Sequence, residues 1–442
     1  MTHSLAQLRA GELAGVRRLQ LREGLSEFPH EIFKLADSLE ILDLSGNQLH
    51  ALPDDLPRLH KLRVIFCSDN AFTELPEVLG QCQQLSMVGF KANRIARVSP
   101  HSLPAQLRWL ILTDNALTSL PAEIGTCTQM QKLALAGNRL GSLPPELANC
   151  TRLELLRISA NQLGQFPEWL LHMPRLTWLA FAGNPFCEQL ESTAMAHAPM
   201  DQFAWSALQL QHQLGEGASG VIHKAVLHTP HGEVAVAVKL FKGAVTSDGL
   251  PDCEMAACMH AGAHPHLVSA IGQVTQHPQH TQALVMPLIA PEFGNLASPP
   301  SLDSCTRDVY PTDTHIDWRA ALRMAQGIAS AVLHLHRRGI VHGDLYAHNI
   351  LHTAEGHALL SDFGAAAFFD VTDTRRAQGL EKLEVRALGC LLEELTWHCK
   401  AQAAHTTHHQ ALVQLAQQCL REVPAERPSL TQVGAMLEAL DA

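Results

Sequence analysis

The sequence contains Leu133-Ala-Leu-Ala-Gly-Asn138-Arg-Leu-Gly-Ser-Leu-Pro144, and the same order of residue types returns along its amino-terminal half. An asparagine recurs there in steps of 23, 23, 22, 23, 23 and 23 residues. Apolar residues stand five and three positions before each asparagine and two positions after it. Seven matches in one phase indicate an internal repeat, and a repeat of this length predicts a solenoid. The asparagines are Asn47, Asn70, Asn93, Asn115, Asn138, Asn161 and Asn184.

Each repeat predicts a short strand followed by a turn and a convex segment. Apolar residues two positions apart give a strand with one buried face. The asparagine can bond backbone groups where the chain turns away inside the stack. A Leu-Pro pair such as Leu143-Pro144 follows in most repeats, and proline stops the strand from continuing. One repeat cannot bury its own apolar edge, whereas stacked repeats can.

These features resemble the intracellular class of leucine-rich repeats with the Leu-Pro-x-x-Leu signature, over roughly residues 17 to 190. The resemblance implies a concave strand face that binds protein. We expect a protein substrate or signalling partner to dock on an apolar stripe of that face. The alternative is that these side chains pack on each other or on the rest of the chain. The stripe is centred on Phe66, Met87, Trp109 and Trp178.

Composition limits the classes of function. A chain of 442 residues exceeds the usual size of one domain, and its 46% apolar residues supply ample core. The net charge of −11 gives no electrostatic footprint for nucleic acid. No apolar run is long enough to span a membrane, and the start lacks the features of a secretory signal, so we expect a cytoplasmic protein. The eleven cysteines are an odd number, and we expect buried free thiols.

The carboxy-terminal half begins with a glycine-rich stretch, Leu214-Gly-Glu-Gly-Ala-Ser-Gly220. A Gly-x-Gly-x-x-Gly pattern alone is a weak signal, because dinucleotide-binding folds carry it too. Here a β-rich run follows, Glu233-Val-Ala-Val-Ala-Val-Lys239, which ends in a lysine. Glycines let the backbone close over phosphates, and a lysine can neutralise their charge.

Four further motifs follow in order. Glu254 lies in a helix-like stretch, and Ala283-Leu-Val-Met-Pro-Leu288 is typical of a buried strand. Then come Val341-His-Gly-Asp344-Leu-Tyr-Ala-His-Asn349 and Ser361-Asp362-Phe-Gly364. This order and spacing resemble the protein kinase family over roughly residues 205 to 442.

The resemblance implies a role for each matching residue. Lys239 would hold the α- and β-phosphates of ATP and pair with Glu254, while Asn349 and Asp362 would hold Mg²⁺. Asp344 would accept the proton of the substrate hydroxyl. Such chemistry needs positioning and charge neutralisation more than covalent help from the protein. The other nucleotide contacts would be Gly215, Gly217, Gly220, Ile222, Ala237, Met286 and Leu351.

The sequence departs from the family at several places. Gly343 replaces the arginine that commonly precedes the catalytic aspartate and reads a phosphorylated loop. Tyr346 stands where serine/threonine kinases usually carry a lysine. The peptide-binding shelf after Asp362 is nearly absent, because the stretch from Glu384 to Gly389 already resembles the start of the long helix that follows the shelf in the family. Glu381 is the expected ion-pair partner of Arg427.

We therefore expect a multidomain α/β protein. A leucine-rich-repeat solenoid would span residues 1–190, a cap and linker 191–206, and a bilobal protein-kinase-like domain 207–442. The first hypothesis for its function is an ATP- and Mg²⁺-dependent protein kinase, of serine/threonine type, whose repeats recruit a partner or substrate. The alternatives are a nucleotide-binding pseudokinase scaffold and a kinase-like enzyme that phosphorylates a small molecule.

Overall fold

A computed structural model describes residues 3–197, 201–217, 219–242, 246, 248–399 and 406–440. The chain divides into two compact units, residues 1–170 and 171–442. The division falls inside the stretch that we assigned to the repeats, so the last repeat groups with the carboxy-terminal part. The predicted bounds of the solenoid, linker and kinase-like domain follow sequence patterns, and they stay a prediction.

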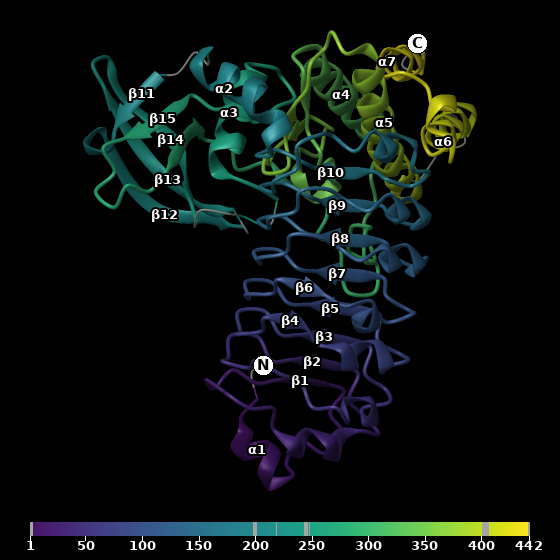
Figure 1. Ribbon diagram of the computed structural model, residues 1–442. Helices are drawn as coiled ribbons and strands as arrows, with labels where there is room; N and C mark the ends of the chain where they lie inside the picture. Colours follow the sequence, from purple (N-terminus) through teal and green to yellow (C-terminus); the bar gives the residue numbers. More distant parts are fainter. Residues whose placement is uncertain are drawn as a thin grey trace. The chain divides into compact units, whose positions relative to one another are not determined.

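The first unit is a stack of short parallel strands, which Figure 1 shows one above another. Helix α1 (Leu5–Ala10) precedes them, and a Ser4 capping box begins that helix. The strands are β1 (Arg18–Gln20), β2 (Ile41–Asp43), β3 (Val64–Phe66), β5 (Met87–Gly89), β7 (Trp109–Ile111), β8 (Lys132–Ala134) and β9 (Leu155–Arg157). A second parallel pair is β4 (Glu74–Leu75) and β6 (Arg97–Val98).

The repeated asparagines join successive turns of the stack, as the sequence predicts. Asn138 donates from Nδ2 to the carbonyls of Leu112 and Leu135, at 2.8 and 2.9 Å, and its Oδ1 accepts from the Leu117 amide. Buried backbone groups thus find partners where the strand ladder stops. The proline that follows each Leu begins a convex 3₁₀ turn, as Pro121 does for Ala122–Thr126.

One feature of the turns escaped the sequence analysis. The residue before every repeated asparagine has a positive φ, between 52° and 73°. Glycine occupies three of these positions, and Asp or Ala occupies the other four, where a Cβ makes the left-handed conformation costly. The asparagine bonds therefore hold strained turns in place.

The second unit begins inside the last repeat and contains a β-sheet part and a helical part (Figure 1). Strand β10 (Trp178–Ala180) and helix α2 (Glu188–His197) come first. A six-stranded sheet follows in the order β11-β15-β16-β14-β13-β12. Its strands are β11 (Asp201–Ala204), β12 (Leu208–Glu216), β13 (Gly220–Thr229), β14 (Gly232–Phe241), β15 (Gly272–Thr275) and β16 (Ala283–Pro287).

Helix α3 (Pro251–Ala261) lies next to this sheet (Figure 1). The remaining helices form the larger part of the unit. They are α4 (Trp318–Arg337), α5 (Thr374–His398), α6 (Thr406–Cys419) and α7 (Leu430–Glu438). Short strand pairs connect them: β17 (Gly294–Asn295) with β19 (Ile350–His352) and β20 (Ala358–Leu360), and β18 (Ile340–Val341) with β21 (Ala367–Phe368). A small β-sheet part next to a large helical part agrees with the predicted bilobal arrangement.

Two expectations about composition can be compared with the structure. All eleven cysteines are buried thiols, as predicted. Within the described residues, no helix is long and apolar enough to cross a membrane. The cytoplasmic location expected from the sequence stays a prediction.

Candidate functional site

Strand β14 and helix α3 bring the predicted lysine and glutamate together. Lys239 lies near the end of β14 and forms an ion pair with Glu254 on α3, and both side chains are almost fully buried. Burial raises the pKa of Glu254 to about 7, although the charge of Lys239 lowers it. Burial by itself lowers the pKa of Lys239, but the charges of Glu254 and Asp362 leave it above its ordinary value. The pair therefore keeps the ammonium charged in a site with little water.

The loop of residues 342–351, which we call the catalytic loop, has a fixed shape. Nδ2 of Asn349 donates to the Asp344 carbonyl at 3.0 Å and to Asp344 Oδ2 at 2.8 Å. The fully buried ring of His342 donates from Nε2 to the Ser361 carbonyl, and its Nδ1 accepts from the Asp344 amide. Both contacts are satisfied by one tautomer, so the histidine fixes the backbone on either side of the acidic residues.

Strand pairing places Asp362 beside this loop. Ile350 pairs with Leu360 in the β19–β20 hairpin, and the amide and hydroxyl of Ser361 both donate to the Asn349 carbonyl. Asp362 follows with a positive φ of 59°, and its Oδ1 accepts from the Gly364 amide at 3.1 Å. The same Oδ1 lies 4.0 Å from Nζ of Lys239. Lysine, glutamate and aspartate from three separate motifs thus meet at one place.

The donor set at this place suits a magnesium ion. Asn349 commits its amide nitrogen to Asp344, which leaves the amide oxygen as a ligand, and the carboxylate of Asp362 is 46% exposed. Carboxylate and amide oxygens are the hard ligands that Mg²⁺ prefers. Bound there, the ion would neutralise phosphate charge. The chain's own residues hold the two oxygens in place, and Lys239 lies 4.0 Å from the Asp362 carboxylate.

The glycine-rich stretch forms the predicted hairpin. Gly215 ends up in β12 opposite Ile222 of β13, and the Gly217 amide donates to the Gly220 carbonyl at 2.9 Å. A Cβ at Gly220 would lie 2.5 Å from the Leu240 carbonyl oxygen, so this glycine is required by the packing of β13 on β14. Lys242 forms an ion pair with Glu216, the last residue of β12 before the turn of the hairpin.

The residues predicted around adenine lie on neighbouring elements. Ala237 of β14 is directly opposite Met286 of β16, and both are buried. Leu351 lies on β19, two residues after Asn349, and is half-buried. Their joint role in nucleotide binding stays a prediction.

Two polar pairs of the catalytic loop were missed by the sequence analysis. Asp308 accepts from the backbone amide of His348 at 2.8 Å and from its Nδ1 at 2.7 Å. Burial lowers the pKa of His348, but the bond to Asp308 and the nearby carboxylates leave it above the ordinary value. Buried Glu384 accepts from the Gly343 amide and from Nε2 of His336, each at 2.9 Å. A lone acid or histidine gives no sequence signal, because the two members of each pair are 40 or more residues apart.

Three expectations about this region are wrong. Glu381 does not pair with Arg427: it accepts from the Leu430 amide, while Arg427 donates to three backbone carbonyls. Helix α5 begins at Thr374, ten residues earlier than the stretch at Glu384 that resembled its start. Trp178 is not an exposed member of the concave stripe, because its ring is stacked on Tyr346 and only 2% exposed.

The stripe in the first unit is correspondingly smaller. Met87 is buried, while Phe66 and Trp109 are half-buried and meet edge to face with ring centres 6.5 Å apart. The ammonium of Lys132 lies 4.5 Å from the centre of the Trp109 ring. Part of the predicted docking surface therefore packs on itself.

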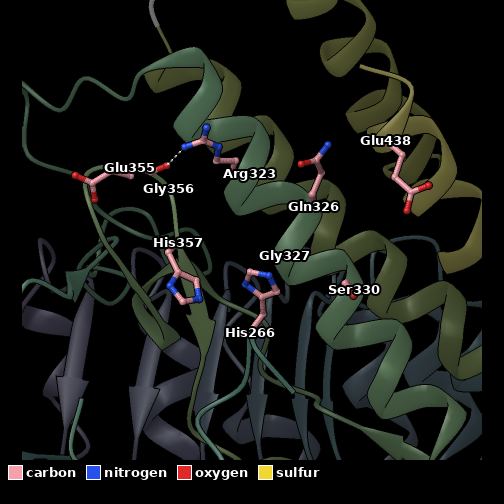
Figure 2. Close-up of a pocket in the computed structure, with 9 residues that line it drawn as sticks. All are labelled: His266, Arg323, Gln326, Gly327, Ser330, Glu355, Gly356, His357 and Glu438. Carbon is pink, nitrogen blue, oxygen red and sulfur yellow. Dashed lines mark hydrogen bonds between the residues drawn. The ribbon is translucent and has the colours of Figure 1, made fainter. Parts of the chain in front are cut away.

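A cavity of about 600 Å³ lies elsewhere in the second unit, between α4, the β19–β20 turn and α7. Figure 2 shows its lining, in which Arg323 donates to the Glu355 carbonyl. None of the predicted catalytic or nucleotide-binding residues lines it. The meeting of Lys239, Glu254 and Asp362, not the volume of a cavity, locates the candidate active site.

Comparison with known proteins agrees with both halves of the chain. A family described as protein tyrosine and serine/threonine kinase matches residues 208–394, and two leucine-rich-repeat families match residues 38–59 and 128–186. The kinase family covers both kinds of acceptor hydroxyl. The match does not distinguish serine/threonine from tyrosine.

Three relatives illustrate the range of similarity. A probable LRR receptor-like serine/threonine-protein kinase of Arabidopsis thaliana is 29% identical over 41% of this chain and 29% of its own length. Serine/threonine-protein kinase PknK of Mycobacterium tuberculosis is 32% identical over 35% of this chain and 13% of its own. Probable serine/threonine-protein kinase PBL24 of Arabidopsis thaliana is 26% identical over 51% of this chain and 61% of its own. The chain thus matches less than two thirds of each relative's length.

Proposed function

We propose that this chain, which carries leucine-rich repeats followed by a protein kinase domain, transfers the γ-phosphoryl group of ATP to a protein hydroxyl with the help of Mg²⁺. The observation that carries the proposal is the convergence of Lys239, Glu254 and Asp362. The ion pair between Lys239 and Glu254 is formed, and Asp362 is 4.0 Å from the same ammonium. These groups come from β14, α3 and the turn after β20, which are three separate parts of the unit.

Each residue contributes to positioning. Lys239 offers its charge to the phosphates, and Asp344 stands on a loop that Asn349 and His342 hold rigid, so that it can orient a substrate hydroxyl and accept its proton. Placing reacting groups and matching charge account for most catalysis of this kind. The names of the three relatives just described favour serine or threonine as the acceptor, although Tyr346 departs from the serine/threonine pattern.

The test is incubation of the full chain with γ-labelled ATP and Mg²⁺, with a mixture of generic protein substrates present. Label should appear on serine or threonine of protein. Tight ATP binding without transfer would support a nucleotide-binding scaffold instead. Label on a small molecule alone would support the small-molecule enzyme.

We also propose that the repeats recruit the protein substrate through Phe66 and Trp109, the half-buried aromatic pair. Aromatic anchors commonly carry much of the energy of an interface. Trp109→Ala should lower the phosphorylation of a protein target that the parent prefers. It should leave the phosphorylation of a generic peptide unchanged. If Trp109→Ala and the parent phosphorylated the protein target at equal rates, this face would have no role in substrate choice.

A further inference from the structure

The second unit contains the end of the last repeat, residues 171–187, which we call the last-repeat segment. In the first unit the repeats bond to each other, whereas this segment is bonded to the helices and loops around the candidate active site. It is therefore in a position to affect the catalytic groups directly.

Trp178 of β10 holds the middle of the catalytic loop. Its ring is stacked on Tyr346, with ring centres 4.0 Å apart and planes at 11°. Its Nε1 donates to the Leu345 carbonyl at 2.9 Å. Leu345 and Tyr346 directly follow Asp344. The tryptophan thus fixes the backbone between Asp344 and Asn349 by a stack and a hydrogen bond at the same time.

The backbone of β10 also explains the glycine that precedes the catalytic aspartate. Gly343 has a φ of +73°, and a Cβ there would lie 2.6 Å from the carbonyl oxygens of both Leu179 and Ala365. Neither an arginine nor any other side chain fits between them. The departure from the kinase pattern at this position is therefore a requirement of the close approach of β10.

Two buried arginines anchor the rest of the segment. Arg386 of α5 donates from Nε to the Arg175 carbonyl and to Oγ1 of Thr177, at 3.2 and 3.1 Å. Arg427 donates from Nη2 to the Pro174 carbonyl at 2.7 Å. Hydrogen bonds from a charged donor are stronger than neutral ones, so this stretch of backbone is held firmly.

A second connection runs from the segment to helix α3. Glu191 of α2 is 7% exposed and accepts from the Gly183 amide, in the turn after β10, at 2.8 Å. The same carboxyl interacts with the thiol of Cys253, the residue before Glu254. Helix α2 thus links the turn of the last repeat to the helix that carries the partner of Lys239.

We infer that the last-repeat segment is part of the kinase active site, with Trp178 as a positioning residue for the catalytic loop and Glu191 as a positioning residue for α3. This inference rests on the proposed kinase function. The chain after Asp362 reaches helix α5 at Thr374 and offers few residues to support the loop. The last repeat supplies that support in a form that needs no phosphorylation.

The test compares four variants of the full chain. Trp178→Phe keeps a stacking ring and loses the hydrogen bond, Trp178→Ala loses both, and Tyr346→Leu removes the stack from the other side. Trp397→Ala is the control, because Trp397 is 84% exposed. Hydrogen exchange of residues 342–351 and the separate values of kcat and KM for ATP are measured for each.

Trp178→Ala should speed exchange in the catalytic loop and lower kcat at least about tenfold while KM for ATP stays within about twofold. Trp178→Phe should restore part of both, and Trp397→Ala should match the parent. A structural role alone would lower kcat only by the fraction of protein unfolded. Parent-like loop exchange in Trp178→Phe, Trp178→Ala and Tyr346→Leu would overturn the inference. If the parent transfers no phosphate, the proposed function fails, and the exchange result still decides this point.

Substitution of Glu191 should change KM for ATP more than kcat, which is the opposite of the result expected for Trp178. Glu191→Gln keeps an oxygen acceptor for the Gly183 amide, whereas Glu191→Ala does not. Glu191→Ala should raise KM for ATP more than it lowers kcat, because α3 positions the phosphate-binding lysine. Glu191→Gln should lie close to the parent. Equal KM values for the parent and both variants would contradict the role assigned to Glu191.

Discussion

At the scale of residues, the structure strongly constrains any replacement of Gly343. Its left-handed φ and the two carbonyl oxygens 2.6 Å from a would-be Cβ act together. Gly343→Ala should therefore lower the free energy of unfolding by about 2 kcal/mol or more, from backbone strain and the steric clash combined. Denaturant unfolding of the full chain measures the effect.

The control for that substitution is Gly434 in α7. A Cβ there would meet no atom within 4 Å. Gly434→Ala should raise stability by roughly 0.5–1 kcal/mol, because alanine restricts the unfolded chain and favours a helix. If Gly343→Ala were as stable as Gly434→Ala, this would contradict the close approach of the Leu179 carbonyl to Gly343.

His348 gives a prediction about pH. Its pKa is raised in the folded protein, so the bond to Asp308 adds stability that is fully present below the ordinary value of 6.5 and is lost as pH rises through the raised pKa. His348→Gln should therefore cost on the order of 1 kcal/mol at acid pH and less in alkali. Unfolding measured across this range checks it, and a cost that grows with pH would contradict it.

The sequence predicted which polar groups come together where chemistry fixes their spacing, and their catalytic and binding roles stay a prediction. Lys239, Glu254, Asp344, Asn349 and Asp362 are polar groups on separate motifs in a required order. The structure brings Lys239, Glu254 and Asp362 together and joins Asn349 to Asp344. Trp178 was predicted to belong to the docking stripe, with packing on the rest of the chain as the alternative, because it occupies the same repeat position as Trp109. Its burial depends on contacts with residues far along the chain, such as Leu345, which is 167 residues away.

At the scale of elements, Arg427 connects the last-repeat segment to α5 and to the turn after α6. Arg427 donates to the carbonyls of Arg421, Lys382 and Pro174, and burial and the charge of Arg386 lower its pKa to about 9. Arg427→Met would leave three carbonyls without this donor. It should cost about 3 kcal/mol of unfolding free energy.

Two controls accompany Arg427→Met. Arg421→Met removes an arginine that is 51% exposed and should change stability little. Glu381→Gln should also be mild, because Glu381 bonds the Leu430 amide and an amide oxygen can replace it. A loss of unfolding free energy in Glu381→Gln as large as that in Arg427→Met would contradict this result. It would support the ion pair between Glu381 and Arg427 that the family pattern suggested.

The repeats show why element-level prediction succeeded in the first half. A 23-residue period with an asparagine in phase fixes strand, turn and convex segment locally. In the second half, β14 and α3 lie where sequence patterns placed a strand and a helix. The start of α5 was not predicted correctly, because the family pattern places the peptide-binding shelf before this helix. In this chain the helix begins earlier, at Thr374, with Asp373 as its N-cap.

At the scale of the whole molecule, activity should not depend on phosphorylation of the chain. The segment from Asp362 to Asp373 is short, and Gly343 cannot read a phosphate. Complete dephosphorylation should leave kcat within about twofold, since no charge-assisted contact is lost. A large fall would show that a basic residue, such as Arg376 near Asp373, reads a phosphate on this segment.

The central claim is that the second unit is a working phosphotransferase, and Asp344 tests it most directly. Initial rates of phosphoryl transfer and the affinity for ATP are measured for the parent, for Asp344→Asn and for Asp303→Asn, an exposed aspartate of the same unit. Asp344→Asn should turn over roughly 10²–10⁴-fold more slowly with nearly unchanged ATP affinity, because it removes the base that orients the hydroxyl. Asp303→Asn should match the parent. An Asp344→Asn variant that transfers phosphate within a few-fold of the parent rate would contradict the account.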